Sequence, residues 1–359
     1  MMRPIAIVGA PTALGIKPYD DGHPRQVDLA PSVYRALGIS TQLGARDDGD
    51  VTPAGYRDTV RNGMETRNED LIVRYSHELA ARVANAGANG EFVLVLGGDC
   101  SIVTGTLFGV RSSRQRVGLA YLDSHADFAL PEQSRTGSAS SMCLGHAVGH
   151  GSTPLSRLRD DGPLVREEDT VIVGRNPAAD EPEEAKEALL ASRILDLNRD
   201  IIRGSAPGSV PERVLERVTG NDADGFWIHF DADVQNPELV PSVDSPEPGG
   251  LSFEEAIALL RPLVNHPAAL GMQVTIHDPG LDPDGRGGRA MVQVIVSATR
   301  EGVQQHTFVV NSHVVQHARA VRQDKLHKLH GHRPTLPECA VESAPGSRIG
   351  FTLASLESV

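Results

Sequence analysis

The sequence GLAYLDSHAD at residues 118–127 joins a short apolar run to a polar cluster, and this pattern decides the fold class. The run is short enough for one buried strand, and an aspartate follows it directly. Two further segments repeat the arrangement, FVLVLGGDCS at 92–101 and GFWIHFDAD at 225–233. Near-continuous apolar strands are typical of a parallel sheet covered by helices on both faces. We therefore predict an α/β fold.

Strand and helix patterns alternate along the first 300 residues, which also favours a parallel sheet. We predict strands at 5–9, 92–96, 118–122, 170–173, 193–195, 225–230 and 271–276. We predict helices at about 66–88, 101–110, 138–149, 181–191, 209–219, 252–264 and 286–299.

Two regions stand apart from this alternation. Residues 40–65 are rich in Gly, Asp, Arg and Thr and are expected to form an excursion from a core domain spanning 1–300. Residues 301–359 are expected to form a C-terminal extension of unassigned role, for which a strand pair with a helix, an oligomer arm and disorder are the alternatives. Four histidines of this extension, His317, His327, His330 and His332, lie among Lys, Arg and Gly, which favours a solvated basic tail over a second metal site.

Composition limits the function classes. The chain has 359 residues and a formal net charge of −13, which argues against nucleic acid or an anionic membrane as the main partner. The longest apolar runs are too short to span a bilayer, and the N-terminus lacks the parts of a signal peptide. Three cysteines provide no disulfide framework. These features predict a cytoplasmic protein.

The polar clusters predict a metal site at one edge of the sheet. Ligands of open parallel sheets bind beyond the carboxyl ends of the strands, where all three clusters would lie. Alternate side chains of an extended segment point the same way, so Asp123, His125 and Asp127 converge, as do Asp231 and Asp233. Carboxylates this close would take up protons unless a cation lay between them, and an oxygen-rich site with one imidazole suits Mn(II) better than Zn(II). Each cluster alone could be a solvated turn or a helix cap, but their combination favours the metal site.

The same clusters resemble signature motifs of the ureohydrolase family, which includes arginases, agmatinases and formimidoylglutamases. GGDCS at 97–101 is similar to the family's Gly-Gly-Asp-His-Ser, LDSHADF at 122–128 to its Asp-Ala-His-x-Asp, and FDADVQNP at 230–237 to its Phe-Asp-x-Asp-x-x-Asp-Pro. Weaker matches at 7–11, 30–38, 171–175 and 248–254 follow in family order. The resemblance covers about residues 5–300.

This resemblance implies a three-layer α/β/α sandwich with a mainly parallel central sheet. It implies Mn(II), one or two ions per chain, and a metal-bound hydroxide that attacks the carbon of a small amidine or guanidine, with Asp127 accepting a hydrogen bond from the hydroxide. A homo-oligomer, a trimer or hexamer, is also implied. The implied metal ligands are Cys100, Asp123, His125, Asp127, Asp231 and Asp233.

Cys100 is the first departure from the family pattern, because it replaces a histidine ligand. As a thiolate it would be a soft ligand, better matched to Zn(II) or Fe(II) than to Mn(II), and the alternative is that it is a buried packing residue. Divergent members of the family that act on N-hydroxylated arginine-like substrates resemble this chain in carrying cysteine here. An N-hydroxyguanidine is therefore a candidate substrate.

The second departure concerns substrate binding. Guanidine-cleaving relatives carry a Glu-x-x-Pro element, and this chain has Ile276 at the corresponding spacing before Pro279. His277 and Asp278 are the candidate substrate-binding residues nearby, and Glu247 is an alternative. His277 and Asp278 could equally form a cap before a loop.

The third departure is the loop that carries a proton-shuttle histidine in relatives. Residues 136–143 resemble that loop, and Ser140 stands in the place of the histidine and is a candidate substrate-binding residue. His146 is the candidate catalytic surrogate and His150 its alternative, although a solvent-facing or capping histidine is the commoner case. Cys143 is interpreted as a packing residue.

Two functions are consistent with this pattern. The first is a metal-dependent hydrolase of a linear amidine or guanidine C–N bond. The second is a degenerate, catalytically weak member that keeps one metal as a structural pin and acts as a binding subunit. All five remaining ligand positions are intact, which favours the hydrolase, whereas three changed functional positions favour the alternative.

Overall fold

The computed structural model describes residues 3–52, 55–57 and 65–300, and the predicted C-terminal extension lies outside them. Eight strands form one sheet in which every pair of neighbours is parallel, in the order β2-β1-β3-β8-β7-β4-β5-β6. The strands are β1 (Ile5–Ala10), β2 (Arg46–Asp50), β3 (Phe92–Gly97), β4 (Gly118–Leu122), β5 (Thr170–Val173), β6 (Leu195–Leu197), β7 (Phe226–Asp231) and β8 (Ala269–Thr275).

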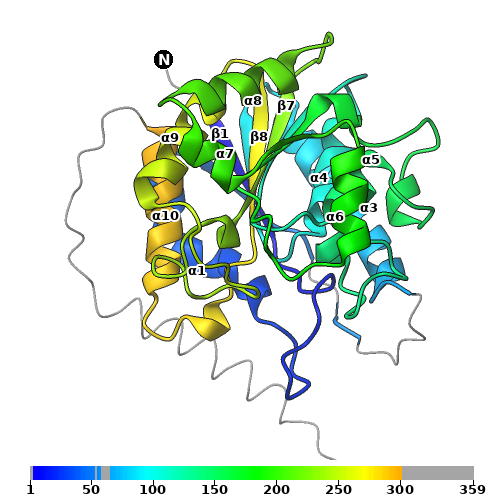
Figure 1. The fold of residues 1–359 in the computed structure, drawn as a ribbon. Coiled ribbons are helices and arrows are strands. Elements are labelled where there is room, and N and C mark those ends of the chain that lie inside the picture. The colour runs from blue at the N-terminus through cyan, green and yellow to red at the C-terminus, as the bar shows by residue number, and fades with distance from the viewer. Residues whose placement is uncertain (1–2, 53–54, 58–64, 301–359) are drawn as a thin grey trace, which may run out of the picture. The chain divides into compact units, whose positions relative to one another are not determined.

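Helices cover both faces of this sheet and complete the predicted α/β/α sandwich (Figure 1). On one side α3 (Glu69–Gly87) packs on α4 (Ile102–Val110), with α5 (Cys143–Val148) beside α4. On the other side α8 (Ser209–Thr219), α9 (Phe253–Val264) and α10 (Arg286–Thr299) pack in sequence. The remaining α-helices are α1 (Ala30–Ala36), α2 (Ile39–Leu43), α6 (Glu183–Ala191) and α7 (Arg199–Gly204).

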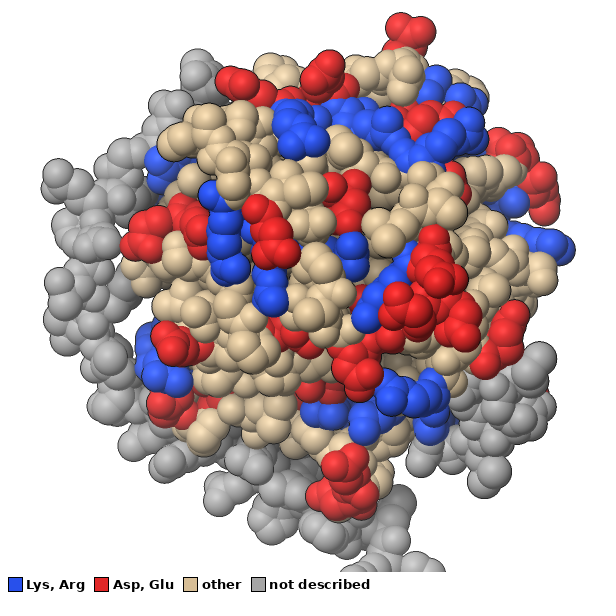
Figure 2. Space-filling view, in the orientation of Figure 1, with Lys and Arg blue, Asp and Glu red and all other residues tan. Residues whose placement is uncertain are grey.

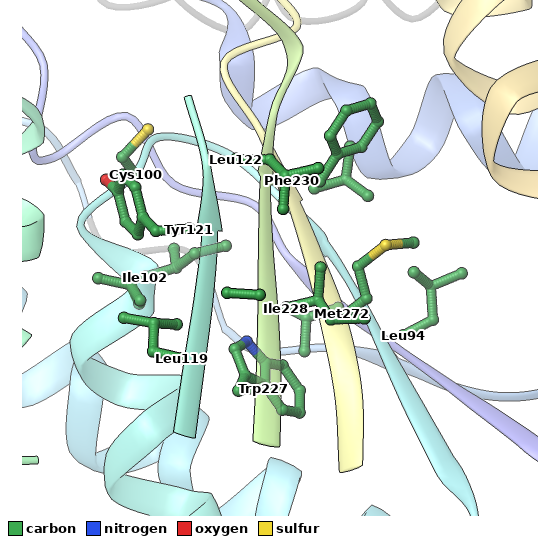
Figure 3. Close-up of a cluster of buried hydrophobic side chains, with 14 of the residues drawn as sticks. Leu94, Cys100, Ile102, Leu119, Tyr121, Leu122, Trp227, Ile228, Phe230 and Met272 are labelled. Carbon is green, nitrogen blue, oxygen red and sulfur yellow. The ribbon is translucent and has the colours of Figure 1, made fainter. Parts of the chain in front are cut away.

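The central strands form because their residues are apolar on both faces. Every residue of β1, β3, β4, β5, β7 and β8 is buried. Ile228, Met272 and Leu94 stand at paired positions of the neighbouring strands β7, β8 and β3 and lie together in the core (Figure 3). In contrast, β2 is charged and partly exposed, as suits an edge strand.

The α3–α4 contact depends on glycine. A Cβ atom at Gly109 would lie 2.5 Å from the carbonyl oxygen of Ala80, and one at Gly105 would lie 2.9 Å from the Cα atom of Ser76. The two helix backbones therefore approach more closely than any side chain on these faces of α4 would allow.

Most predicted elements match the structure within a few residues, but five short segments differ. Residues 46–50, inside the expected excursion, form the edge strand β2. Their sequence shows no alternation of apolar and polar residues, because these side chains are exposed or only partly buried. Helices α1, α2 and α7 were not predicted, since they are only seven, five and six residues long. The strand expected at 193–195 begins two residues later, as β6. Within the described ranges, no helix combines the length and apolarity needed to cross a membrane.

Candidate metal centre

Four adjacent strands, β3, β8, β7 and β4, bring their carboxyl ends to one edge of the sheet. Leu122 pairs with Phe230, and Asp231 pairs with Thr275, so the residues after these positions meet in space. Cys100 follows β3 by three residues, and Asp123 follows β4 directly. The three polar clusters of the sequence therefore converge, as predicted.

The first group of potential ligands contains Cys100, Asp123, His229 and Asp231, all buried, with one donor atom from each lying within 4.8 Å of the others. The Cys100 thiol donates to Asp231 Oδ2 at 2.6 Å, and Thr275 Oγ1 donates to the same oxygen at 3.1 Å. Burial and the charge of Asp231 raise the pKa of Cys100 well above its ordinary value. Cys100 thus lies in the site, where its surroundings favour the protonated thiol.

The second group contains Asp123, His125 and Asp233 and offers only oxygen and nitrogen atoms. His125 Nδ1 lies 3.0 Å from Asp233 Oδ2 and 3.6 Å from Asp123 Oδ1. Backbone hydrogen bonds fix the carboxylates, since His125 N–H donates to Asp123 Oδ1 at 2.7 Å and Asp233 N–H donates to Asp231 Oδ1 at 2.9 Å. The arrangement that alternation predicted is therefore formed by two tight aspartate turns.

Asp127 lies beside these groups without belonging to either set of closely spaced donors. Its backbone adopts a left-handed conformation with φ of 48°, which is uncommon outside glycine and typical of functional sites. Tyr121 donates its hydroxyl hydrogen to Asp127 Oδ2 at 2.6 Å. Burial and the charge of Asp123 raise the pKa of Asp127 well above its ordinary value.

The charges of this cluster fit a divalent cation. Burial and the neighbouring carboxylates raise the pKa of Asp231 well above its usual range and raise the pKa of Asp233 to about 6. Burial opposes ionisation of Asp123 too, but the His125 and His229 imidazoles lower its pKa to about 2. Asp123 Oδ2 and His229 Nε2 are buried without a hydrogen-bond partner. A cation among these groups would offset the repulsion and give the carboxylate oxygen a partner.

A cavity of about 310 Å³ opens onto the cluster. Lys17, Arg135 and a row of serines line one part of it, and Glu181, Asp244 and Glu247 line another. On the face drawn in Figure 2, acidic and basic side chains intermingle, and neither sign forms a continuous field. The cavity therefore offers hydroxyl groups and charges of both signs to a small polar molecule.

The candidate substrate-binding residues separate in the structure. Ser140 lines the cavity and donates to the carbonyl oxygen of Gly15 at 2.9 Å. His277 instead stacks on Tyr34 with ring centroids 5.3 Å apart, and Asp278 caps Gly280 N–H at 2.8 Å. Neither His277 nor Asp278 lines the cavity, so their capping alternative matches the geometry.

Ile276 lines the cavity, whereas its neighbours His277 and Asp278 do not. Its φ of 67° is exceptional for a β-branched residue, and it turns the chain as β8 ends. Ile276 N–H donates to the carbonyl oxygen of Gly98 at 2.9 Å, which ties this turn to the loop that carries Cys100.

The candidate proton-shuttle residue His146 is buried within α5 and is not among the residues that line the cavity. Burial, with a smaller contribution from His150, lowers the pKa of His146 to about 3. His150 stacks on Phe128 with ring centroids 4.5 Å apart. Cys143 is buried, and its thiol donates to the carbonyl oxygen of Ala139 at 3.1 Å, in keeping with a packing residue.

Sequence reasoning missed two residues of the site. His229 lies two positions before Asp231, so the period-two rule that grouped the aspartates could have found it on the same face of β7. Glu181 approaches from a loop: its Oε1 accepts from Ala126 N–H at 2.7 Å, while its Oε2 is buried without a partner. No local pattern predicts where such a loop returns to the sheet.

Comparison with known proteins agrees with this geometry. A family model described as the arginase family matches residues 3–300. The arginase of Bacillus caldovelox is 30% identical over 265 residues, which cover 71% of this chain and 84% of the relative. A solved structure of that species' arginase has a TM-score of 0.75 at 27% identity and covers 84% of this chain and 100% of its own. The proclavaminate amidino hydrolase of Streptomyces clavuligerus shares the fold, with a TM-score of 0.60 at 18% identity over 89% of this chain and 92% of its own.

Proposed function

Because the chain belongs to the arginase family and is a hydrolase of C–N bonds in linear amidines or guanidines, we propose that it acts on a modified guanidine, such as an N-hydroxyguanidine, at a manganese centre. The observation that carries the proposal is the convergence of carboxylate, imidazole and thiol donors from the carboxyl ends of β3, β7 and β4.

Asp123, His125 and Asp233 are the residues that would hold a manganese ion most firmly. Their donors are oxygen and nitrogen atoms, which suit Mn(II). A second ion beside Cys100 would bind more weakly for two reasons. The Cys100 thiol must lose its proton to ligate the ion, and the pKa of this thiol is raised. The thiol also donates a hydrogen bond to Asp231 Oδ2, which is then less available to the ion. When bound, manganese supplies Lewis acidity that lowers the pKa of water and stabilises negative charge.

Asp127 is proposed to take up the proton of the attacking water. Its raised pKa suits a group that must accept a proton near neutral pH, and the Tyr121 hydroxyl fixes its carboxylate in place. Glu181 and Glu247 would attract the cationic end of a substrate, since both line the cavity. Ser140 would orient the opposite, polar end, while His146 stays a predicted proton-transfer residue that no contact supports.

Two departures from the family pattern support a modified guanidine. Cys100 weakens one metal position, and Ile276 presents an aliphatic side chain where relatives are expected to grip a guanidinium with a carboxylate. An ordinary guanidinium would lose that charge-assisted hydrogen bond, worth roughly 1.5–3 kcal/mol. A substrate that carries its own hydroxyl, or a group less basic than a guanidinium, depends less on that hydrogen bond and therefore loses less binding free energy.

The test is a panel of guanidines, N-hydroxyguanidines and formimino compounds incubated with manganese-loaded protein, with assays for urea, hydroxyurea and ammonia. We expect turnover of at least one modified guanidine, and Asp123→Ala should abolish it while lowering the manganese content, since Asp123 belongs to both ligand groups. Bound manganese without turnover of any compound would support the degenerate, structural alternative instead. Turnover that persists in Asp123→Ala would contradict the proposed site.

A further inference from the structure

His229 is a fully buried residue that the proposed function leaves without a role. It lies on β7 below Asp231 and stacks on Tyr121 with ring centroids 4.0 Å apart and planes only 3° from parallel. Its Nε2 atom faces Asp123 Oδ2 at 3.7 Å and Asp231 Oδ2 at 4.0 Å. Its position among these carboxylates leaves two roles, a ligand of the ion or a hydrogen-bond donor to the ligands.

The contact between the other ring nitrogen, Nδ1, and the side-chain amide of Gln273 distinguishes these two roles. The Trp227 indole is a donor only, and its Nε1–H lies 3.1 Å from Gln273 Oε1. The Thr106 hydroxyl contacts the same oxygen. The amide of Gln273 can therefore not be reversed, and its Nε2 is the atom that faces His229 Nδ1 at 2.7 Å.

An amide NH₂ group only donates, so Nδ1 of His229 must accept and the ring proton must reside on Nε2. A histidine that ligates a metal has the opposite arrangement, with one nitrogen bare for the ion and the other donating its hydrogen to an acceptor. We infer that His229 is a positioning residue, locked by Gln273 as the Nε2–H tautomer, which donates toward the Asp123 carboxylate and does not ligate the ion.

The unpartnered atoms agree with this assignment. Asp123 Oδ2 is a buried acceptor without a donor, and His229 Nε2–H is a buried donor without an acceptor. A shift of less than about 1 Å would bring the pair to hydrogen-bond distance. Such a bond would hold one oxygen of Asp123 and direct the other, Oδ1, toward His125 and the second ligand group. The inference rests on the proposed function only in taking Asp123 as a ligand.

The test counts imidazole ligands on manganese-loaded full-length protein. Electron spin echo envelope modulation of bound Mn(II), with ¹⁵N-labelled histidine, reports directly coordinated nitrogen. His229→Gln retains an N–H donor and His229→Phe retains only the ring stack on Tyr121. We expect the coordinated-nitrogen signal of the parent protein to persist in both variants. A signal that loses one nitrogen in either variant overturns the inference.

Manganese affinity separates positioning from packing. We expect the dissociation constant of manganese to rise about 10- to 100-fold in His229→Phe and to return to within about threefold of the parent in His229→Gln, because an outer hydrogen bond is lost and then restored. An unchanged affinity in His229→Phe overturns the positioning role. Thermal melting of both variants checks that they fold.

The tautomer itself can be measured without activity or metal. Nitrogen–proton correlation spectra of ¹⁵N-histidine-labelled full-length protein, compared with those of His229→Gln, identify the His229 signals. We expect a protonated Nε2 and a bare Nδ1, and the reverse pattern overturns the inference. If the protein hydrolyses no amidine, the proposed function fails, yet this spectrum still decides the state of His229.

Discussion

Cys100 is the single residue on which the metal stoichiometry depends. Its thiol donates to Asp231 Oδ2, and burial raises the pKa of the thiol, so the first ligand group contains an internal hydrogen bond. The sequence left open whether Cys100 is a ligand or a packing residue. The structure places it in the site with the chemistry of a hydrogen-bond donor.

Replacement of Cys100 by histidine should open that position. An imidazole is a better partner for Mn(II) than a thiol, so Cys100→His is expected to raise manganese content from about one to about two ions per chain. Metal analysis after gel filtration measures this, and Cys143→Ala is the matched control because that buried thiol donates to a backbone carbonyl and not to a metal-ligand carboxylate. A loss of stability with unchanged manganese would contradict the prediction and favour a packing role.

Ile276 is the residue that should set the substrate preference. We expect Ile276→Glu to raise kcat/KM for an unmodified guanidine, relative to a modified one, by about tenfold or more, because a carboxylate would then meet the guanidinium inside the cavity. Kinetics with both substrates measure the ratio. Ile276→Leu keeps the apolar surface and should leave the ratio unchanged, and an equal change in both variants would point to backbone strain instead.

At the scale of elements, the contact between α3 and α4 should be intolerant of added volume. Gly109→Ala is expected to lower the free energy of unfolding by about 1–3 kcal/mol, because the new methyl group must displace the backbone at Ala80. Urea denaturation measures the loss. Gly204→Ala in α7 is the control, since no atom lies within 4 Å of its added Cβ and helix propensity favours alanine there. Equal effects of the two substitutions would show that the close approach is unimportant.

The sequence predicted those elements whose side chains are buried on both faces, because only burial imposes a hydrophobic pattern. All six fully buried strands were found for this reason. The edge strand β2 was missed because its charged residues carry no such pattern. In the site, the alternation of side chains along an extended segment predicted that Asp123, His125, Asp231 and Asp233 point toward one another. The position of Glu181 could not be predicted in this way, because it depends on how a loop packs against the sheet.

For the whole molecule, the crowded carboxylates couple stability to metal and pH. Asp233 has a folded-state pKa raised to about 6, above its unfolded value, so its contribution to stability is complete at low pH and is lost as pH rises through 6. Metal-free protein is therefore expected to lose stability from this group between about pH 4 and pH 7. Manganese should restore it, by about 2.7 kcal/mol at a hundredfold excess over the dissociation constant.

Asp233→Asn separates these contributions. The variant should melt at a less pH-dependent temperature than the parent when metal-free, because the titrating group is gone. It should also show little or no rise in melting temperature with manganese, because one ligand oxygen is lost. Melting curves at pH 5 and pH 7.5, with and without manganese, measure both effects. A full manganese-dependent rise in the variant would rule out Asp233 as a ligand.

The order of the strands also determines when a metal site can exist during synthesis. β8 lies between β3 and β7, although it is the last strand within the part of the chain that the structure describes. On the ribosome, a nascent polypeptide that already contains the first seven strands still lacks the strand that joins the two halves of the sheet. Cys100 on one half and Asp123 on the other meet only when β8 is inserted, so we expect metal binding to follow the insertion of β8 rather than to precede it.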